Sequence, residues 1–122
     1  MAFAEPEFQL TDEPLDDHTH VIAISGEIHV STAPAFARGL DAALARGATG
    51  VVVDLDAVGF IDSTGLSVLL NGLRGISRRH GQMALVVSNP TVLRLFEVTG
   101  LDGTFDIRRT REEALSSMRA AG

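Results

Sequence analysis

Hydrophobic and polar residues follow two different periods in the middle of the chain. The run Val51–Val53, closed by Asp54 and Leu55, has no polar alternation, which predicts a strand buried on both faces of a mostly parallel sheet. After it, apolar residues recur at helical spacing and predict a helix with one buried stripe. That stripe consists of Leu66, Leu69, Leu70, Leu73 and Ile76. The polar stretch 56–65 between them predicts a corner where the strand passes into the helix.

The N-terminal part predicts a hairpin at the edge of the sheet, followed by a helix. Its two strands are Phe8–Leu10 and His20–Ile24, and the acidic stretch 12–17 with Pro14 predicts the turn between them. The helix has Ser31 or Thr32 as its N-cap and Pro34 in its first turn. Its apolar face and its end are marked by Phe36, Leu40, Leu44 and Gly47.

The C-terminal part predicts two more strands and two more helices. We expect the long helix to end at His80 and Gly81, because glycine suits the residue just after a helix. The next elements are a strand at Met83–Val87, a helix from Asn89 and Pro90 to Gly100, a strand at Phe105–Ile107 and a last helix with Thr110 and Glu113 as its capping box.

The order of these elements is ββαβαβαβα, which predicts an α/β fold. The sheet is expected to be mixed but mostly parallel, with about five strands and about four helices. We interpret residues 1–122 as a single domain with its core at about 19–119. Ser63 and Thr64 then lie where a central strand passes into a helix, and functional sites collect at that place in open α/β sheets.

Composition excludes several classes of protein. Of the 122 residues 45% are hydrophobic, which is typical of a globular chain, and no apolar run approaches the roughly 18–20 residues of a membrane span. Met1–Glu5 has neither the basic nor the apolar region of a signal peptide. The absence of cysteine excludes disulfides and thiol catalysis and fits a cytoplasmic location.

Charge argues against several partners and cofactors. The net charge is −6, so the chain lacks the basic footprint of a DNA- or RNA-binding protein. All ten basic residues are arginine, which excludes a P-loop and Schiff-base catalysis, because both need lysine. The four histidines do not have the spacing of a metal site. We therefore expect no metal, no cofactor and no membrane contact, and a monomer is the default.

Several blocks of the sequence together resemble a STAS domain of the anti-sigma factor antagonist class. The resemblance extends from about Val21 to Met118. It rests on blocks that keep their order along the chain: Gly26-Glu27-Ile28 with Thr32, Val51–Leu55, Phe60–Leu66, Ser88-Asn89-Pro90, Leu93–Phe96 and Thr99-Gly100-Leu101.

That resemblance implies a function in bacterial transcription regulation. Such a protein binds an anti-sigma factor that is also a serine kinase with a GHKL-type ATP site, and binding releases the sigma factor. The kinase phosphorylates the serine after the aspartate, here Ser63, and the modified protein dissociates. A PP2C-type phosphatase then removes the phosphate. The protein itself is not an enzyme in this scheme, because the nucleotide belongs to the kinase.

The resemblance also implies a partner-binding surface at the start of the long helix and in the loop after the second strand. Relatives often have Gly-Glu-Leu-Asp in that loop, whereas this chain has His29 in place of the final acid, which bears on the hydrogen bonds near Ser63 and on the choice of kinase. We expect Gly65 to leave room for a partner's backbone. The expected surface comprises Gly26, Glu27, His29, Thr32, Asp62, Ser63, Thr64, Gly65 and Leu66.

Ser63 also permits plainer interpretations. It could serve only as the N-cap of the helix, and Asp62 could serve only to form a turn. As a switch, Ser63 would gain about −1.5 to −2 charges on phosphorylation, beside Asp62 and with Asp54 and Asp56 as further acidic candidates. The free N–H groups of the first helical turn would tolerate that phosphate.

Two other functions compete with the switch. A serine hydrolase is disfavoured, because the chain has no Gly-x-Ser-x-Gly motif. The alternative that stays open is a STAS scaffold module of a signalling or transport complex, which is not phosphorylated at all.

Overall fold

The computed structural model describes residues 8–121, and the order of its elements is the predicted one. Residues 1–7 and Gly122 lie outside the described residues, and with them the Met1–Glu5 stretch that lacks signal-peptide features. The elements are β1 (Gln9–Pro14), β2 (Thr19–Ile28), α1 (Ala33–Ala45), β3 (Gly50–Ile61), α2 (Ser63–Ser77), β4 (Gln82–Val86), α3 (Pro90–Val98), the 3₁₀ turn η1 (Leu101–Gly103), β5 (Asp106–Arg108) and α4 (Arg111–Ala121).

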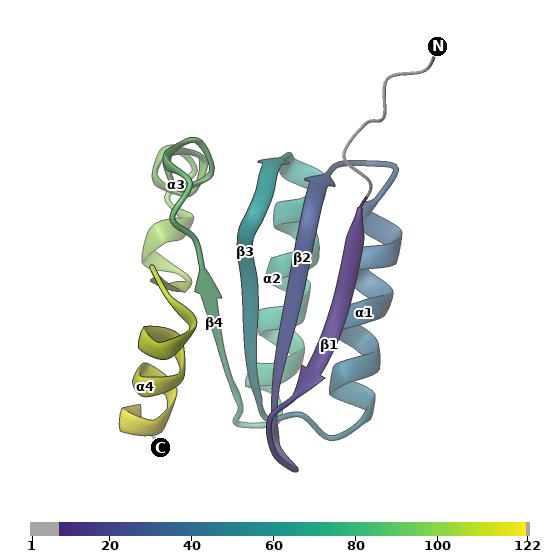
Figure 1. Cartoon of the computed structure of the whole chain (residues 1–122), viewed down its shortest axis with the longest axis vertical. Helices are drawn as coiled ribbons and strands as arrows, with labels where there is room; N and C mark the ends of the chain where they lie inside the picture. The colour runs from purple at the N-terminus through teal and green to yellow at the C-terminus, as the bar shows by residue number, and fades with distance from the viewer. Residues whose placement is uncertain (1–7, 122) are drawn as a thin grey trace.

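The five strands form one mixed sheet in the order β1-β2-β3-β4-β5. β1 pairs antiparallel with β2 at one edge, and the other pairs are parallel, so the predicted fold class is confirmed. Helices α1 and α2 cover one face of the sheet and α4 packs on the other, beside β4 (Figure 1). Because β2, β3 and β4 are parallel, their carboxyl ends meet at one end of the sheet, where β3 passes into α2.

Two hydrophobic clusters hold these layers together. The larger lies between the sheet and helices α1, α2 and α3, and includes Ile22, Leu69 and Phe96, each fully buried. The smaller lies under α4 and includes Val52 and Ala114. Within residues 8–121, no helix has both the length and the apolar content to cross a bilayer.

The predicted turn at 12–17 is wrong in its first half. Residues 12–14 belong to β1, because the Asp12 carboxylate turns inward and lies 2.6 Å from Nδ1 of the buried His20 on β2. Pro14 is tolerated at the end of an edge strand, where its missing N–H has no partner to lose. The chain turns only afterwards, where Asp16 Oδ1 accepts hydrogen bonds from the N–H groups of His18 and Thr19.

The predicted corner at 56–65 is shorter than expected, because β3 continues to Ile61. Val58 and Ile61 are buried, and the last residues of β3 pair with the extended end of β2. Two register shifts in this pairing, after Ala23 and after Gly26, break the simple alternation by which a strand is recognised. The strand therefore extends to the residue before Asp62.

Helix α2 ends at Ser77, earlier than predicted. The chain then turns through His80, which has a left-handed φ of 61°, so His80 and not Gly81 occupies that conformation. Gly81 is needed for a different reason, since a Cβ there would lie 2.4 Å from the Thr49 carbonyl oxygen. The predicted caps Asn89 and Thr110 do accept hydrogen bonds at the starts of α3 and α4.

Candidate functional site

The corner between β3 and α2 is capped by Asp62. Its backbone is extended, and its Oδ1 accepts hydrogen bonds from the N–H groups of Thr64 at 2.9 Å and Gly65 at 3.1 Å. The Leu66 N–H bonds to the Asp62 carbonyl oxygen at 3.0 Å. The interpretation of Ser63 as the N-cap is therefore wrong, and the first-turn N–H groups of Thr64 and Gly65 are not free to receive a phosphate.

Ser63 is the first residue of α2, and its side chain is exposed. Thr64 is partly exposed beside it, whereas Leu66 is only 5% exposed and begins the buried stripe of the helix. The Ser63 carbonyl oxygen accepts a hydrogen bond from Ser67 Oγ at 3.0 Å, which ties the first turn to the second. The Ser63 hydroxyl thus lies at the surface on a rigid support.

Gly65 allows the helix to begin this close to the sheet. A Cβ at this position would lie 2.6 Å from Ile28 Cγ2 and 2.7 Å from Ile61 Cγ1, both of which are side-chain atoms of buried residues. Gly65 is itself buried, so it does not make room for a partner's backbone as the sequence suggested. Its place is beneath the surface, where it brings the helix start against the ends of β2 and β3.

The end of β2 and the turn after it lie directly beside this corner, and Gly26 and Glu27, expected in the loop, belong to the strand because they pair with β3. Glu27 pairs with Phe60 and Ile28 pairs with Ile61, and the Asp62 N–H donates to the Ile28 carbonyl oxygen at 3.1 Å. Glu27 is exposed, whereas Gly26 is buried and has a φ of 97°, a backbone conformation that favours glycine.

Thr32 and His29 shape the turn that leads into α1. Thr32 Oγ1 donates to the Glu27 carbonyl oxygen at 2.8 Å and accepts from the His29 N–H at 2.9 Å. The His29 ring accepts from the Ser31 N–H at 3.2 Å through Nδ1, so this side chain also supports its own turn. The structure therefore brings the two segments of the expected surface together. Its exposed or partly exposed members are Glu27, His29, Thr32, Asp62, Ser63 and Thr64.

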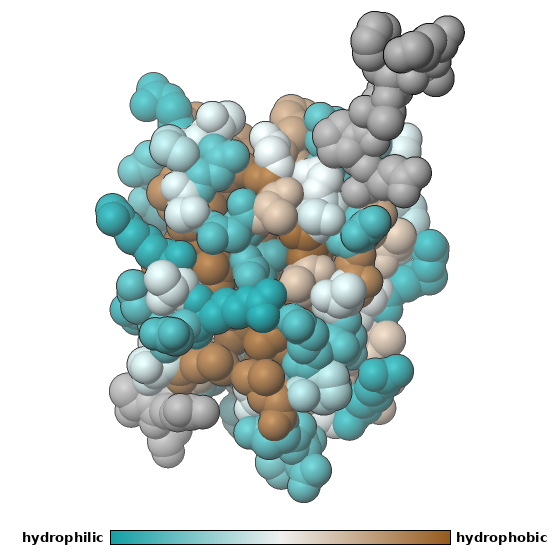
Figure 2. All heavy atoms as spheres, in the orientation of Figure 1, coloured by the Kyte–Doolittle hydropathy of each residue, from teal (hydrophilic) through white to brown (hydrophobic). Residues whose placement is uncertain are grey.

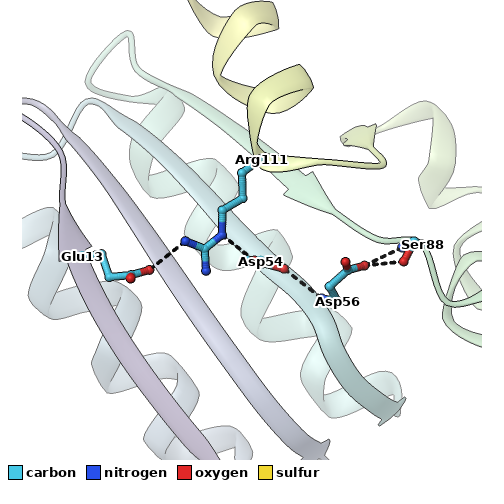
Figure 3. Close-up of polar contacts among 5 residues, drawn as sticks. All are labelled: Glu13, Asp54, Asp56, Ser88 and Arg111. Carbon is cyan, nitrogen blue, oxygen red and sulfur yellow. Dashed lines mark hydrogen bonds and ion pairs between the residues drawn. The ribbon is translucent and has the colours of Figure 1, made fainter.

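Asp54 and Asp56 serve other contacts (Figure 3). Asp54 Oδ2 accepts from Arg111 Nε at 2.6 Å, and Arg111 also reaches Glu13 at 3.1 Å, so this side chain crosses the face of the sheet from α4 to β1. The hydrogen bond to Asp54 raises the pKa of Arg111. Asp56 Oδ1 accepts from both the N–H and the Oγ of Ser88, which holds the start of the β4–α3 loop.

These two carboxylates are too far from Ser63 to act on it strongly. At about 3.3 Å per residue, the strand places Asp54 about 23 Å and Asp56 about 16 Å from its last residue, Ile61. Both distances exceed the screening length of about 8–10 Å at ordinary ionic strength. Of the acidic neighbours expected from the sequence, Asp62 alone lies next to Ser63.

Loss of the Asp62 side chain is expected to destabilise the fold by about 1 kcal/mol, because two N–H groups of the first turn lose their acceptor. We expect Asp62→Ala to lower the free energy of unfolding by this amount in urea titrations. Asp62→Asn is the matched control, since asparagine caps equally well and should stay close to the wild type. An Asp62→Ala protein as stable as the wild type would contradict the capping role.

A family comparison decides what kind of domain carries this corner. The model of the family described as "STAS domain" matches residues 12–114. The chain belongs to the STAS domain family. This STAS domain is 31% identical over 98 residues to the "Anti-sigma-B factor antagonist" of Listeria monocytogenes serovar 1/2a, and the match covers 80% of this chain and 86% of that protein.

Solved structures agree with this assignment. An anti-sigma factor antagonist from Mycobacterium paratuberculosis superposes on this STAS domain with a TM-score of 0.85 and 33% identity, covering 93% of this chain and 95% of that one. The antagonist SpoIIAA in its unphosphorylated form gives a TM-score of 0.77 at 26% identity, with coverage of 93% and 97%. The phosphorylated form of SpoIIAA from Bacillus gives 0.68 at 25%, with coverage of 91% and 98%.

This STAS domain has a further feature beside the corner, which the sequence did not predict. An apolar groove of about 520 Å³ lies between the end of β3 and α3, with Phe60 on one wall and Leu95 and Val98 on the other. The residues Val92 and Phe96 form the buried side of α3. Leu95 and Val98, three residues apart, form a second apolar stripe on α3. This stripe is not needed to bury the helix against the sheet, and it is the feature of the sequence that could have indicated the groove.

Proposed function

We propose that this protein is an anti-sigma factor antagonist that is switched by phosphorylation of Ser63. In its unmodified form it binds an anti-sigma factor with serine kinase activity and thereby releases a sigma factor. The kinase then phosphorylates Ser63, the complex dissociates, and a PP2C-type phosphatase restores the binding form. The protein acts in the cytoplasm as a monomeric binding module, and ATP belongs to the kinase.

The observation that carries this proposal is the exposed hydroxyl of Ser63 at the first position of α2, where the helix does not depend on this hydroxyl for its cap. Asp62 alone caps the helix through its side chain, so Ser63 is free of that structural task and accessible to a kinase. A regulatory serine needs such a surface position. The relatives named as anti-sigma factor antagonists, and the existence of a phosphorylated SpoIIAA, support the same role.

The partner surface is formed by the exposed residues at the ends of two strands. Glu27 and His29 lie on one side of the corner, and Ser63 and Thr64 on the other, held together by the bond from the Asp62 N–H to Ile28. The buried residues Gly26, Gly65 and Leu66 act beneath it by fixing the backbone. A partner that covers this surface must also cover Ser63, which makes binding sensitive to a phosphate there.

Phosphate transfer provides the direct test. The protein is incubated with labelled ATP, Mg²⁺ and each purified GHKL-type kinase of its own genome in turn, and intact-mass and peptide analysis locate the label. We expect one kinase to add a single phosphate, at Ser63, and Ser63→Ala to remain unlabelled. If none of these kinases labels Ser63, the switch is wrong and an unphosphorylated scaffold module explains the fold better.

A further inference from the structure

The groove between the end of β3 and α3 presents unusually exposed apolar side chains. Val98 is 72% exposed and Phe60 is 46% exposed, and Pro90 and Leu95 line the space between them. Large apolar side chains that stay in water cost free energy, and a cluster of them with a polar rim commonly marks an interaction site. The groove is therefore a candidate docking site.

Its position joins it to the surface around Ser63. Ile61, the last residue of β3, lines the groove, and Asp62 and Ser63 follow it immediately. Phe60 on β3 pairs with Glu27 on β2, so the groove lies beside the end of β2 as well. A protein that places its active site over Ser63 covers the mouth of the groove at the same time.

The charge of the groove indicates which kind of side chain would bind there. Arg94 is the one charged residue among those lining it, within the part of the chain that the structure describes, and the chain as a whole has a net charge of −6. A guanidinium beside an apolar surface suits an apolar side chain with a carboxylate close to it. The negative charge of such a segment would be repelled by most of the surface of this acidic protein, but attracted by Arg94 at the groove.

We propose that this groove receives an apolar anchor residue, flanked by a carboxylate, from the same kinase that phosphorylates Ser63. The inference rests on the proposed function and adds a second docking point to it. A small molecule fits the groove less well, because small-molecule sites bury most of the ligand among several converging polar groups. Among the described residues that line this groove, Arg94 and Thr91 are the polar ones, and Val98 remains largely in solvent.

The test measures binding of the kinase that labels Ser63 to three charge-changing variants. Val98→Asp places a carboxylate in the apolar wall, and Arg94→Glu reverses the one positive charge. Leu15→Asp is the matched control, because Leu15 is also exposed, at 51%, but follows β1 at the opposite end of the sheet (Figure 1). Leu15 also has apolar neighbours, because Leu15, Leu115 and Met118 line a separate depression. Hydrophobic residues are visible at this lower end of the molecule (Figure 2).

We expect Val98→Asp and Arg94→Glu each to weaken binding by about tenfold or more in titration calorimetry, and Leu15→Asp to stay within about twofold of the wild type. In phosphorylation kinetics, the two groove variants should raise the KM for this protein and leave kcat unchanged, since docking away from the reacting hydroxyl is lost equally in the ground and transition states. Thermal unfolding is recorded for all three, and their exposed positions should leave the fold intact.

The possible failures are distinct. If Val98→Asp binds the kinase as tightly as the wild type, the groove is not a docking point, while labelling of Ser63 would still support the switch. If Arg94→Glu binds the kinase as tightly as the wild type, the proposed carboxylate beside the anchor residue is wrong. If Leu15→Asp loses as much affinity as the groove variants, the effect comes from net charge, and the groove is not a docking point. If no kinase labels Ser63 at all, the proposed function itself has failed.

Discussion

Phosphorylation of Ser63 is expected to weaken binding of the anti-sigma kinase by several hundred-fold. The modification adds about −1.5 to −2 charges beside the Asp62 carboxylate, and the N–H groups of Thr64 and Gly65 already bond to that carboxylate. The phosphate would therefore depend on water for most of its hydrogen bonds and would lose that water when a partner covers it. A penalty of about 3–4 kcal/mol corresponds to the expected loss, at about 1.4 kcal/mol per tenfold.

Three variants separate charge from shape in this prediction. Ser63→Ala should bind as tightly as the unmodified protein, because the hydroxyl is exposed and does not cap the helix. Ser63→Glu should weaken binding by a smaller factor than phosphate, since it adds a single charge. Ser77→Glu adds the same charge at the last residue of α2, about 21 Å away at 1.5 Å per residue, and should bind normally. Equal affinities for the phosphorylated and unmodified proteins in calorimetry would refute the switch.

The order of elements could be predicted because the chain's two periods are clearly separated. The unbroken run Val51–Val53 and the stripe from Leu66 to Ile76 differ in period. The run is buried on β3 as predicted, and Leu66, Leu69 and Ile76 are buried on α2, whereas Leu70 and Leu73 are partly buried. Element ends were harder to predict. β3 continues beyond Asp56 because its last residues pair with the extended end of β2, where Gly26 pairs with Val58, 32 residues later in the chain. No local pattern contains that contact.

Some features of the candidate site could likewise be predicted from the sequence, and others could not. The corner could be predicted, because Asp62-Ser63-Thr64-Gly65 follows a buried strand and precedes a helical stripe. Which side chain caps the helix could not, since aspartate and serine are both good caps and only the backbone conformation of Asp62 decides between them. The groove depends on where α3 packs relative to β3, which is a tertiary relation.

Gly65→Ala is expected to lower the free energy of unfolding by about 1–2 kcal/mol. The added Cβ would lie within 2.7 Å of Ile28 and Ile61, which are buried side chains that have little room to move. Overpacking of this kind costs about 1–3 kcal/mol, and it exceeds the gain of up to about 1 kcal/mol from replacing a helical glycine by alanine. Urea unfolding of the two proteins measures the difference.

Gly75→Ala is the matched control within the same helix. Its Cβ would meet only the end of the Leu44 side chain, at 3.3 Å, so the helical preference of alanine should prevail and the variant should be as stable as the wild type or more so. Since Ile28 and Ile61 hold the two segments of the Ser63 surface, Gly65→Ala should also weaken kinase binding, whereas Gly75→Ala should not. If Gly65→Ala matches Gly75→Ala in both measurements, the close contact of the helix start with the strand ends does not determine the shape of this surface.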